Sequence, residues 1–279
     1  MSLQQSYSNN NSAYWVVIPA GGSGRRYGPT AKQFVPINGE FLITATVKLF
    51  LQSSDCLGVV LVMNDIPASV DTQLLAQWQK FCASEPRLRI VPGGQERVHS
   101  VINGLECVQE LIQRQMGVDV CHLNPWVMVH DGARPCLHTK DLQQLIVCLT
   151  RHKSIEHYET LLTNKPDGFV LGRQVADTLK SVVSHTENIK TKQLQNTVKA
   201  TVARDHLWHA LTPQVFQLQT LLHNLRACLD QHQSVTDESQ AMEICGCTIA
   251  MIEALAANPK LTYPGDEAQV EFLLAHTRV

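Results

Sequence analysis

The chain has 279 residues, of which 44% are hydrophobic and 17% are charged, and its formal net charge is −2. This composition is typical of a soluble globular protein with one large domain. The balanced charge argues against nucleic acid and membrane surfaces as partners, so an anionic ligand would need a local basic site. No apolar run reaches the roughly 20 residues that a membrane-spanning helix requires.

The N-terminus and the cysteines indicate a cytoplasmic protein. Residues 1–13 are rich in Ser, Asn and Gln and lack the basic and apolar segments of a signal peptide, so we expect a disordered tail there. The nine cysteines form no C-x-x-C pair, and the twelve histidines show no zinc-ligand spacing. We therefore expect reduced thiols and a single domain over 14–279.

Strand and helix patterns alternate through the first half of the chain. Short apolar runs predict buried strands at 14–19, 58–63 and 126–129, and a further short strand is expected at 88–91. Apolar residues at helical spacing predict helices at 42–51, 71–81, 100–112 and 141–149. This alternation implies right-handed crossovers and an α/β fold with a mostly parallel, twisted sheet flanked by helices. Sheets of this kind bind ligands at the carboxyl ends of their strands.

The second half of the chain is less regular. Polar stretches, with strand-like segments at 169–171 and 197–202, predict an irregular excursion that includes a β-hairpin arm within about 165–204. Beyond the arm, helical spacing predicts helices at 207–211, 218–229 and 266–276. A further helix through Cys245 would have Thr236 as its N-cap. Short β-rich runs predict final strands at 248–252 and 260–263.

A glycine-rich loop follows the first strand directly, in the segment P-A-G-G-S-G-R-R-Y-G-P-T-A-K-Q-F from Pro19 to Phe34. Glycine lets the backbone approach a ligand closely and turn its amides inward, which suits a polyphosphate. Arg26 and Lys32 supply cations that could neutralise such a ligand. The segment lacks the G-K-[ST] of a Walker loop, and its glycine spacing differs from the G-x-G-x-x-G of dinucleotide-binding folds.

Two further motifs follow predicted strands. The motif G-G-Q-E-R-V-H-S-V begins at Gly93 and places Arg97 and Ser100 on one face at a helix start. The motif V-H-D-G-A-R-P places Asp131 and Arg134 just after a buried strand. The aspartate could meet a ligand or its magnesium ion, or the Asp–Arg pair could only order the loop, and both interpretations stay open at this point. Weaker polar signals lie at 177–180, Arg204, 212–214, 236–238 and Lys260.

Taken together, the motifs resemble those of the 2-C-methyl-D-erythritol 4-phosphate cytidylyltransferase family. The family pattern runs P-A-A-G-x-G-x-R, P-K-Q, G-G-x-x-R-x-x-S-V, V-H-D-A-A-R-P, D-T-x-K, L-W-x-x-x-T-P-Q-x-F, T-D-E and K-x-T-x-P-x-D. The chain carries a match to each of them in this order, over 19–266. It departs from the pattern at Gly21 and Gly132, which replace alanine, at Ala31, which replaces proline, and at Gln95, where an acidic residue is common.

The resemblance implies a Rossmann-like nucleotidyltransferase that joins CMP from CTP to 2-C-methyl-D-erythritol 4-phosphate with the help of Mg²⁺ or another divalent cation. It implies that nucleotide contacts come from Ala20, Gly21, Gly22, Ser23, Gly24, Gly94, Gln95, Arg97 and Ser100. It implies that catalysis depends on Arg26, Lys32, Arg204 and Lys260. It implies that the acceptor is bound by Asp131, Arg134, Thr178 and Thr212. The metal ligands stay unassigned, with Asp131 as a neighbour of the ion.

The resemblance also implies a homodimer formed through the arm, in which each site borrows residues from the partner subunit. The nearest alternative is ribitol 5-phosphate cytidylyltransferase, which shares the chemistry and differs in the acceptor. A dinucleotide-dependent oxidoreductase is disfavoured by the glycine spacing. A nucleotide-binding protein without activity is disfavoured because it would not need transition-state cations such as Arg26, Lys32 and Lys260.

Overall fold

Seven strands form one mixed sheet in the order β11-β7-β10-β6-β1-β4-β5. In chain order they are β1 (Tyr14–Pro19), β4 (Cys56–Val62), β5 (Leu88–Val91), β6 (Trp126–Val129), β7 (Gly168–Gln174), β10 (Trp208–Gln217) and β11 (Ile249–Glu253). β10 runs antiparallel to β6 and β7, and the other neighbouring pairs of this sheet are parallel. The mostly parallel sheet is thus confirmed in this computed structural model, which describes residues 12–22, 27, 31–116, 123–154, 165–184 and 196–276.

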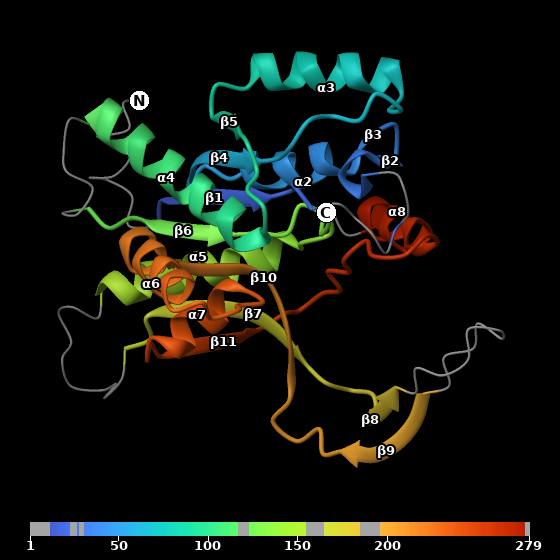
Figure 1. Ribbon diagram of the computed structural model, residues 1–279. Helices are drawn as coiled ribbons and strands as arrows, with labels where there is room; N and C mark the ends of the chain where they lie inside the picture. The colour runs from blue at the N-terminus through green and yellow to red at the C-terminus, as the bar shows by residue number, and fades with distance from the viewer. Residues whose placement is uncertain are drawn as a thin grey trace.

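Helices cover both faces of the sheet (Figure 1). One face carries α2 (Leu42–Leu51), α3 (Thr72–Ser84) and α5 (Thr139–Ser154), and the other carries α4 (Arg97–Met116), α6 (Leu218–Asp230) and α7 (Glu238–Ile244). The sequence of β1 shows why two layers form. Val16 and Ile18 belong to the apolar cluster on the first face, whereas Trp15 and Val17 belong to the cluster on the second. A strand that is apolar on both faces needs a helical layer on each side.

A smaller apolar cluster closes the end of the sheet where the functional motifs gather. It joins the short strand β2 (Pro36–Ile37), which pairs with β3 (Glu40–Phe41), to α8 (Asp266–His276), and its members include Ile37, Leu261 and Val270. The 3₁₀ helix η1 (Lys32–Phe34) precedes β2 directly. Packing of this cluster therefore brings Lys32, from the first part of the chain, next to the segment that contains Lys260.

The expected β-hairpin is present and projects from the body of the molecule (Figure 1). It consists of β8 (Leu179–Ser184) and β9 (Asn196–Val202), which pair only with each other, in antiparallel register from Leu179 opposite Val202. Its valines are unusually exposed for apolar side chains, with 45% for Val182 and 57% for Val198. An exposed apolar hairpin of this kind is a candidate surface for association with another chain.

Three local predictions are wrong. Residues 207–211, expected as a helix because two leucines lie four residues apart, belong mostly to β10, which fills the gap between β6 and β7. Residues 260–263 form no strand, because the Thr262 and Tyr263 amides donate to the Asp266 carboxylate in a turn. The N-cap of α7 is Asp237, whose carboxylate accepts from the Gln240 amide, and not Thr236.

Most of the expected N-terminal tail, residues 1–11, lies outside the described residues, and Ala13, which is described, is buried at the start of β1. Among the helices that the structure describes, none has the length and apolar character needed to cross a membrane.

Candidate active site

A cavity of about 460 Å³ lies at the carboxyl ends of the central strands β1, β4 and β6. Its lining includes the expected nucleotide-binding residues Ala20, Gly21, Gly22, Gly94, Gln95, Arg97 and Ser100. It also includes Lys32, Asp131 and Lys260. Three other expected residues, Ser23, Gly24 and Arg26, lie outside the described residues. The motifs that follow separate strands in the sequence therefore meet at one place, as the parallel sheet predicts.

Two glycine loops face each other across Asn64 at one side of this cavity. The Asn64 amide donates to the Gly21 carbonyl at 3.3 Å. A Cβ atom at Gly93 would lie 2.7 Å from Asn64 Oδ1, so any larger residue at position 93 would displace the Asn64 side chain. Asn64 also lines the cavity, and sequence reasoning missed it because it belongs to no motif.

The start of α4 is built around Ser100. Its hydroxyl accepts from the Gly94 amide at 3.0 Å and donates to the Glu96 carbonyl at 3.2 Å. A Cβ atom at Gly94 would lie 2.3 Å from His99 Cβ, so the loop can follow this path only with glycine there. As expected, Arg97 and Ser100 share the face of α4 that borders the cavity.

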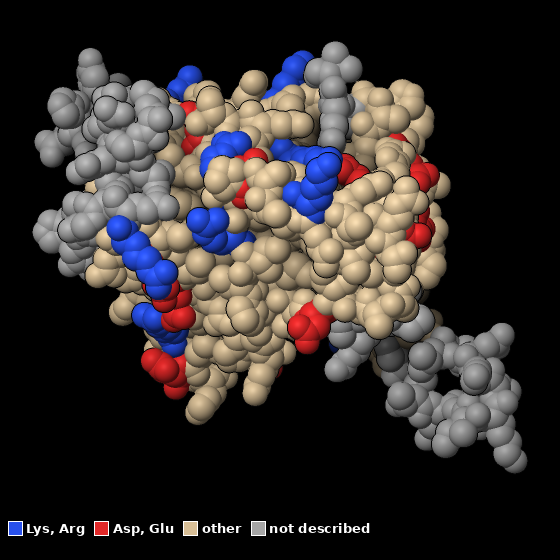
Figure 2. Space-filling model, turned by 90° about the horizontal axis from the view of Figure 1, so that it is seen from above, with Lys and Arg blue, Asp and Glu red and all other residues tan. Residues whose placement is uncertain are grey.

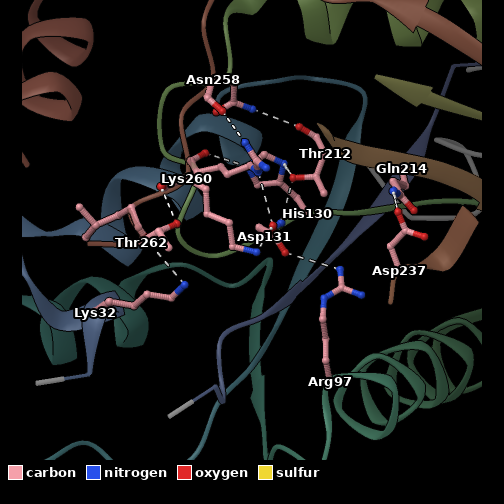
Figure 3. Close-up of polar contacts among 12 residues, drawn as sticks. Lys32, Arg97, His130, Asp131, Thr212, Gln214, Asp237, Asn258, Lys260 and Thr262 are labelled. Atoms are coloured by element: carbon pink, nitrogen blue, oxygen red, sulfur yellow. Dashed lines mark hydrogen bonds and ion pairs between the residues drawn. The ribbon is translucent and has the colours of Figure 1, made fainter. Parts of the chain in front are cut away.

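Asp131 lies at the centre of the cationic side chains (Figure 3). Its Oδ2 accepts from Lys260 Nζ at 2.7 Å and from Arg134 Nε at 3.4 Å, and its Oδ1 lies 3.5 Å from Arg97 Nη2. Burial alone would raise the pKa of Asp131, but the Lys260 and Arg97 charges outweigh it and hold the pKa well below its ordinary value. The structure thus shows the Asp131–Arg134 pair, and Asp131 also borders the cavity, so its contact with a ligand stays a prediction.

A buried chain of hydrogen bonds fixes the loop that carries Asp131. The Asp131 amide donates to Thr212 Oγ1, which lies 3.1 Å from His130 Nδ1, and His130 Nε2 lies 2.9 Å from the Arg134 carbonyl. Burial lowers the pKa of His130 to about 4, so the ring is neutral near pH 7. A neutral ring that donates from Nε2 to the carbonyl and accepts at Nδ1 satisfies every bond of the chain.

Thr212 and Arg134 therefore stand behind the cavity wall in this structure. Thr212 is 5% exposed, and its hydroxyl is engaged by the Asp131 amide and by His130. Arg134 donates to the Asn258 carbonyl at 2.6 Å, and the Asn258 amide donates to the Thr212 carbonyl at 3.1 Å. Neither Thr212 nor Arg134 is among the residues that line the cavity.

The two expected residues of the arm lie away from the cavity of their own chain. Thr178 is exposed just before β8, and Arg204 is exposed just after β9. The Arg204 guanidinium donates to the Ala176 carbonyl, within the base of the arm. The hairpin that these residues flank points away from the sheet (Figure 1).

Two lysine side chains lie in the cavity, although the molecule as a whole is not basic. On the face that Figure 2 shows, Lys and Arg side chains alternate with Asp and Glu side chains, in keeping with the balanced net charge of −2. Inside the cavity, Lys32 Nζ lies 3.4 Å from the Leu261 carbonyl, so this ammonium and that of Lys260 come from adjacent segments (Figure 3). Two ammonium groups beside backbone amides of glycine loops form a site for a polyphosphate.

An α/β sheet with glycine-rich loops and adjacent lysines at the carboxyl ends of its strands, and without a Walker motif, fits an enzyme of the nucleotidyltransferase class. The model of the family described as 2-C-methyl-D-erythritol 4-phosphate cytidylyltransferase matches residues 14–276. The chain belongs to this family, and it is therefore a cytidylyltransferase of the non-mevalonate isoprenoid pathway.

Similar proteins agree with this assignment. A 2-C-methyl-D-erythritol 4-phosphate cytidylyltransferase of Ectopseudomonas mendocina is 34% identical over 260 residues, which cover 92% of this chain and 94% of the relative. One of Baumannia cicadellinicola is 34% identical over 261 residues, which cover 93% and 92%. The crystal structure of the Francisella tularensis enzyme superposes with a TM-score of 0.66 over 94% of this chain and 99% of that one. At 23% identity, this last likeness shows the fold.

Proposed function

We propose that this chain transfers CMP from CTP to 2-C-methyl-D-erythritol 4-phosphate. An oxygen of the acceptor's phosphate attacks the α-phosphorus in line, the bond from that phosphorus to the β-phosphate oxygen breaks, and pyrophosphate leaves. The observation that carries this proposal is the meeting of Lys32, Lys260 and Asp131 in one cavity beside two glycine loops. The reaction joins two anions, so the protein's task is to position them and to stabilise negative charge.

The nucleotide would lie along the glycine loops. Backbone amides of Gly21 and Gly22 would donate to the triphosphate, together with Ser23 and Gly24 of the same loop. Ala20 would border the triphosphate without an amide contact, because its own amide donates to the Val62 carbonyl at 2.7 Å. Gly94, Gln95, Arg97 and Ser100 would surround the cytosine. Lys32 would offset the charge that builds on the α-phosphate and the leaving group, together with Arg26.

The acceptor would lie on the Asp131 side of the cavity. Lys260 is held by Asp131 at 2.7 Å, so its ammonium is placed before the acceptor's phosphate arrives. Arg134 and Thr212 do not line the cavity, and they would support the acceptor side through the loop that they fix. No nucleophilic side chain is required, because the acceptor supplies the attacking oxygen.

Thr178 and Arg204 would act in the site of a partner subunit, in a homodimer formed through the hairpin arm of the single domain over 14–279. Two observations support this. Both residues lie on a projection that is remote from their own cavity (Figure 1), and the hairpin carries exposed valines that a partner would cover. A shared site explains how a catalytic arginine can lie at the base of an arm.

Mg²⁺ or a similar divalent cation fits this site. The described residues contain no cluster of three or more His, Cys, Asp or Glu side chains that would hold a metal by itself. Mg²⁺ bound to a triphosphate keeps water and phosphate oxygens as most of its ligands, and Asp131 would be a neighbour of the ion. The ion would neutralise phosphate charge. A cytoplasmic location is in keeping with the eight described cysteines, which are free thiols.

Pyrophosphate release with CTP and Mg²⁺ tests the proposal. We expect fast release with 2-C-methyl-D-erythritol 4-phosphate and only background release with no acceptor. Release with ribitol 5-phosphate alone would keep the mechanism and replace the acceptor. No release with either acceptor, in the presence of measurable CTP binding, would contradict the proposed transfer.

A further inference from the structure

The carboxylate of Glu238 holds Arg97 from behind the cavity. Glu238 is the first residue of α7, and its side chain is 1% exposed. Its Oε1 accepts from Arg97 Nη1 at 2.5 Å and its Oε2 from Arg97 Nη2 at 2.9 Å. The pair is a fork-to-fork contact, which fixes both the position and the plane of a guanidinium.

The start of α7 is itself anchored, so that Glu238 has a fixed position. Gln214 of β10 donates to Asp237 Oδ2 at 2.9 Å and accepts from the Ser239 amide at 2.8 Å (Figure 3). Asp237 Oδ1 accepts from the Gln240 amide at 3.0 Å. These bonds tie the first turn of α7 to the sheet, two residues along β10 from Thr212, which supports the Asp131 loop.

Arg97 lies between two carboxylates at unequal distances, with Glu238 closer than Asp131. It contacts Glu238 through two hydrogen bonds, whereas its distance to Asp131 Oδ1 is 3.5 Å. Without Glu238, the nearest carboxylate for this guanidinium would be Asp131, which also binds Lys260. A shift of Arg97 toward Asp131 would remove its N–H groups from the nucleotide side and bring it into competition with Lys260.

We propose that Glu238 is a positioning residue, which holds the Arg97 guanidinium at the cavity wall so that its remaining N–H groups face the nucleotide. Glu238 does not line the cavity and acts only through Arg97. This inference rests on the proposed nucleotide contact of Arg97. It assigns the T-D-E motif two roles, since Asp237 caps α7 while Glu238 orients a residue of α4.

Substitution of Glu238 by Gln tests the proposal, because it keeps the shape of the side chain and removes its charge. We expect the KM for CTP to rise about tenfold, as for loss of a hydrogen bond between charged groups. The KM for the acceptor should change little. The temperature of unfolding should fall, because Arg97 loses a buried counter-charge, so the difference between the two KM values is the deciding readout. Glu106→Gln is the matched control, since it breaks an exposed Glu–Arg pair between α4 and α6 outside the cavity and should leave both KM values unchanged.

A double-mutant cycle separates positioning from a structural role. If Glu238 acts through Arg97, the double variant Arg97→Ala, Glu238→Ala should bind CTP no more weakly than Arg97→Ala alone. Additive losses in calorimetric CTP affinity would overturn the proposal, and so would a folded Glu238→Gln protein with the wild-type KM for CTP. If Glu238→Gln does not fold, Glu238→Asp decides, with weakened CTP binding in support and unchanged binding against.

The outcomes also distinguish this inference from the function on which it rests. Weakened CTP binding in Arg97→Ala with wild-type binding in Glu238→Gln would overturn the positioning role alone. Unchanged CTP binding in Arg97→Ala would overturn both the positioning role and the nucleotide contact of Arg97.

Discussion

Lys260 Nζ lies 2.7 Å from Asp131 Oδ2, across 129 positions of the sequence. It is the shortest of the three contacts between cations and this carboxylate, since Arg134 Nε lies at 3.4 Å and Arg97 Nη2 at 3.5 Å. A carboxylate that contacts three cationic side chains offsets their mutual repulsion and fixes their positions around it. Asp131 is thus the residue that connects the proposed acceptor side of the cavity with the nucleotide side.

Replacement of Asp131 by Asn should therefore disturb both sides at once. Three cations would lose their common counter-charge, and the proposed metal would lose a carboxylate neighbour. We expect kcat/KM to fall about 100-fold or more, as for loss of one preorganised electrostatic group. Steady-state rates against both substrates measure this, with Glu110→Gln as a control in an exposed pair on α4. A loss below about threefold would contradict a central role for Asp131.

Lys32 should matter for turnover more than for binding. Its ammonium lies at the cavity beside the Leu261 carbonyl and is proposed to meet charge that develops during transfer. We expect Lys32→Ala to lower kcat on the order of 100-fold or more. Lys48→Ala is a suitable control, because Lys48 pairs with Glu40 away from the cavity. Near-wild-type kcat in Lys32→Ala would remove it from the transition-state machinery.

Arg204 tests the shared site. We expect Arg204→Ala to raise the KM for the acceptor much more than the KM for CTP, because the partner's acceptor side would lose a cation. Equal effects on both constants would remove Arg204 from that side.

Mixing subunits of two variants tests whether Arg204 acts across the dimer without any measurement of KM. If Arg204 acts across the dimer, a mixture of inactive Lys32→Ala and impaired Arg204→Ala proteins should regain activity, because each heterodimer has one intact site. With half of the dimers mixed, about a quarter of the wild-type activity is expected. No recovery after subunit exchange, shown by mass spectrometry of differently tagged chains, would place Arg204 in its own chain's site.

His130 should make stability depend on pH. The unfolded chain binds its proton near a pKa of about 6.5, whereas the folded chain binds it only near a pKa of about 4. Between these values the unfolded state binds more protons, so stability is lost as the pH falls from about 6.5 toward about 4. By about pH 5 the loss should be on the order of 2 kcal/mol. Urea unfolding measures it, and His130→Asn should show a smaller loss; parallel pH curves for the two proteins would contradict the neutral buried ring.

The positions of most expected site residues follow from the sequence because of the sheet. The strands β1 and β6 are short and apolar throughout, and β5 is a short strand that contains Arg89; a motif begins at or just after the end of each of them. Parallel strands end at one edge, so Gly21, Arg97 and Asp131 had to meet there. The wrong prediction of a helix at 207–211 arose because local spacing was used where the position in the sheet decides the structure. The spacing of Leu207 and Leu211 fits a helix, and only the place between β6 and β7 makes this segment a strand.

Other features depend on tertiary contacts that no local pattern reveals. Lys260 lies in a segment without regular structure, which is placed by the bond from the Leu261 amide to the Ala133 carbonyl. Glu238 belongs to a motif that predicts only a helix N-cap. Its bond to Arg97 joins residues 141 positions apart in the sequence, so no local pattern indicates it. His130 is an ordinary member of a strand end in the sequence, and its role is visible only once Thr212 of β10 lies beside it.

The most direct measurement of the central claim is a competition between acceptors. The protein, CTP and Mg²⁺ are incubated with equal concentrations of 2-C-methyl-D-erythritol 4-phosphate and ribitol 5-phosphate, and the CMP-linked products are quantified by mass spectrometry at early times. The product ratio gives the ratio of the two kcat/KM values directly. We expect the methylerythritol product to dominate; a dominant ribitol product, or neither product while CTP is bound, would contradict the proposed transfer.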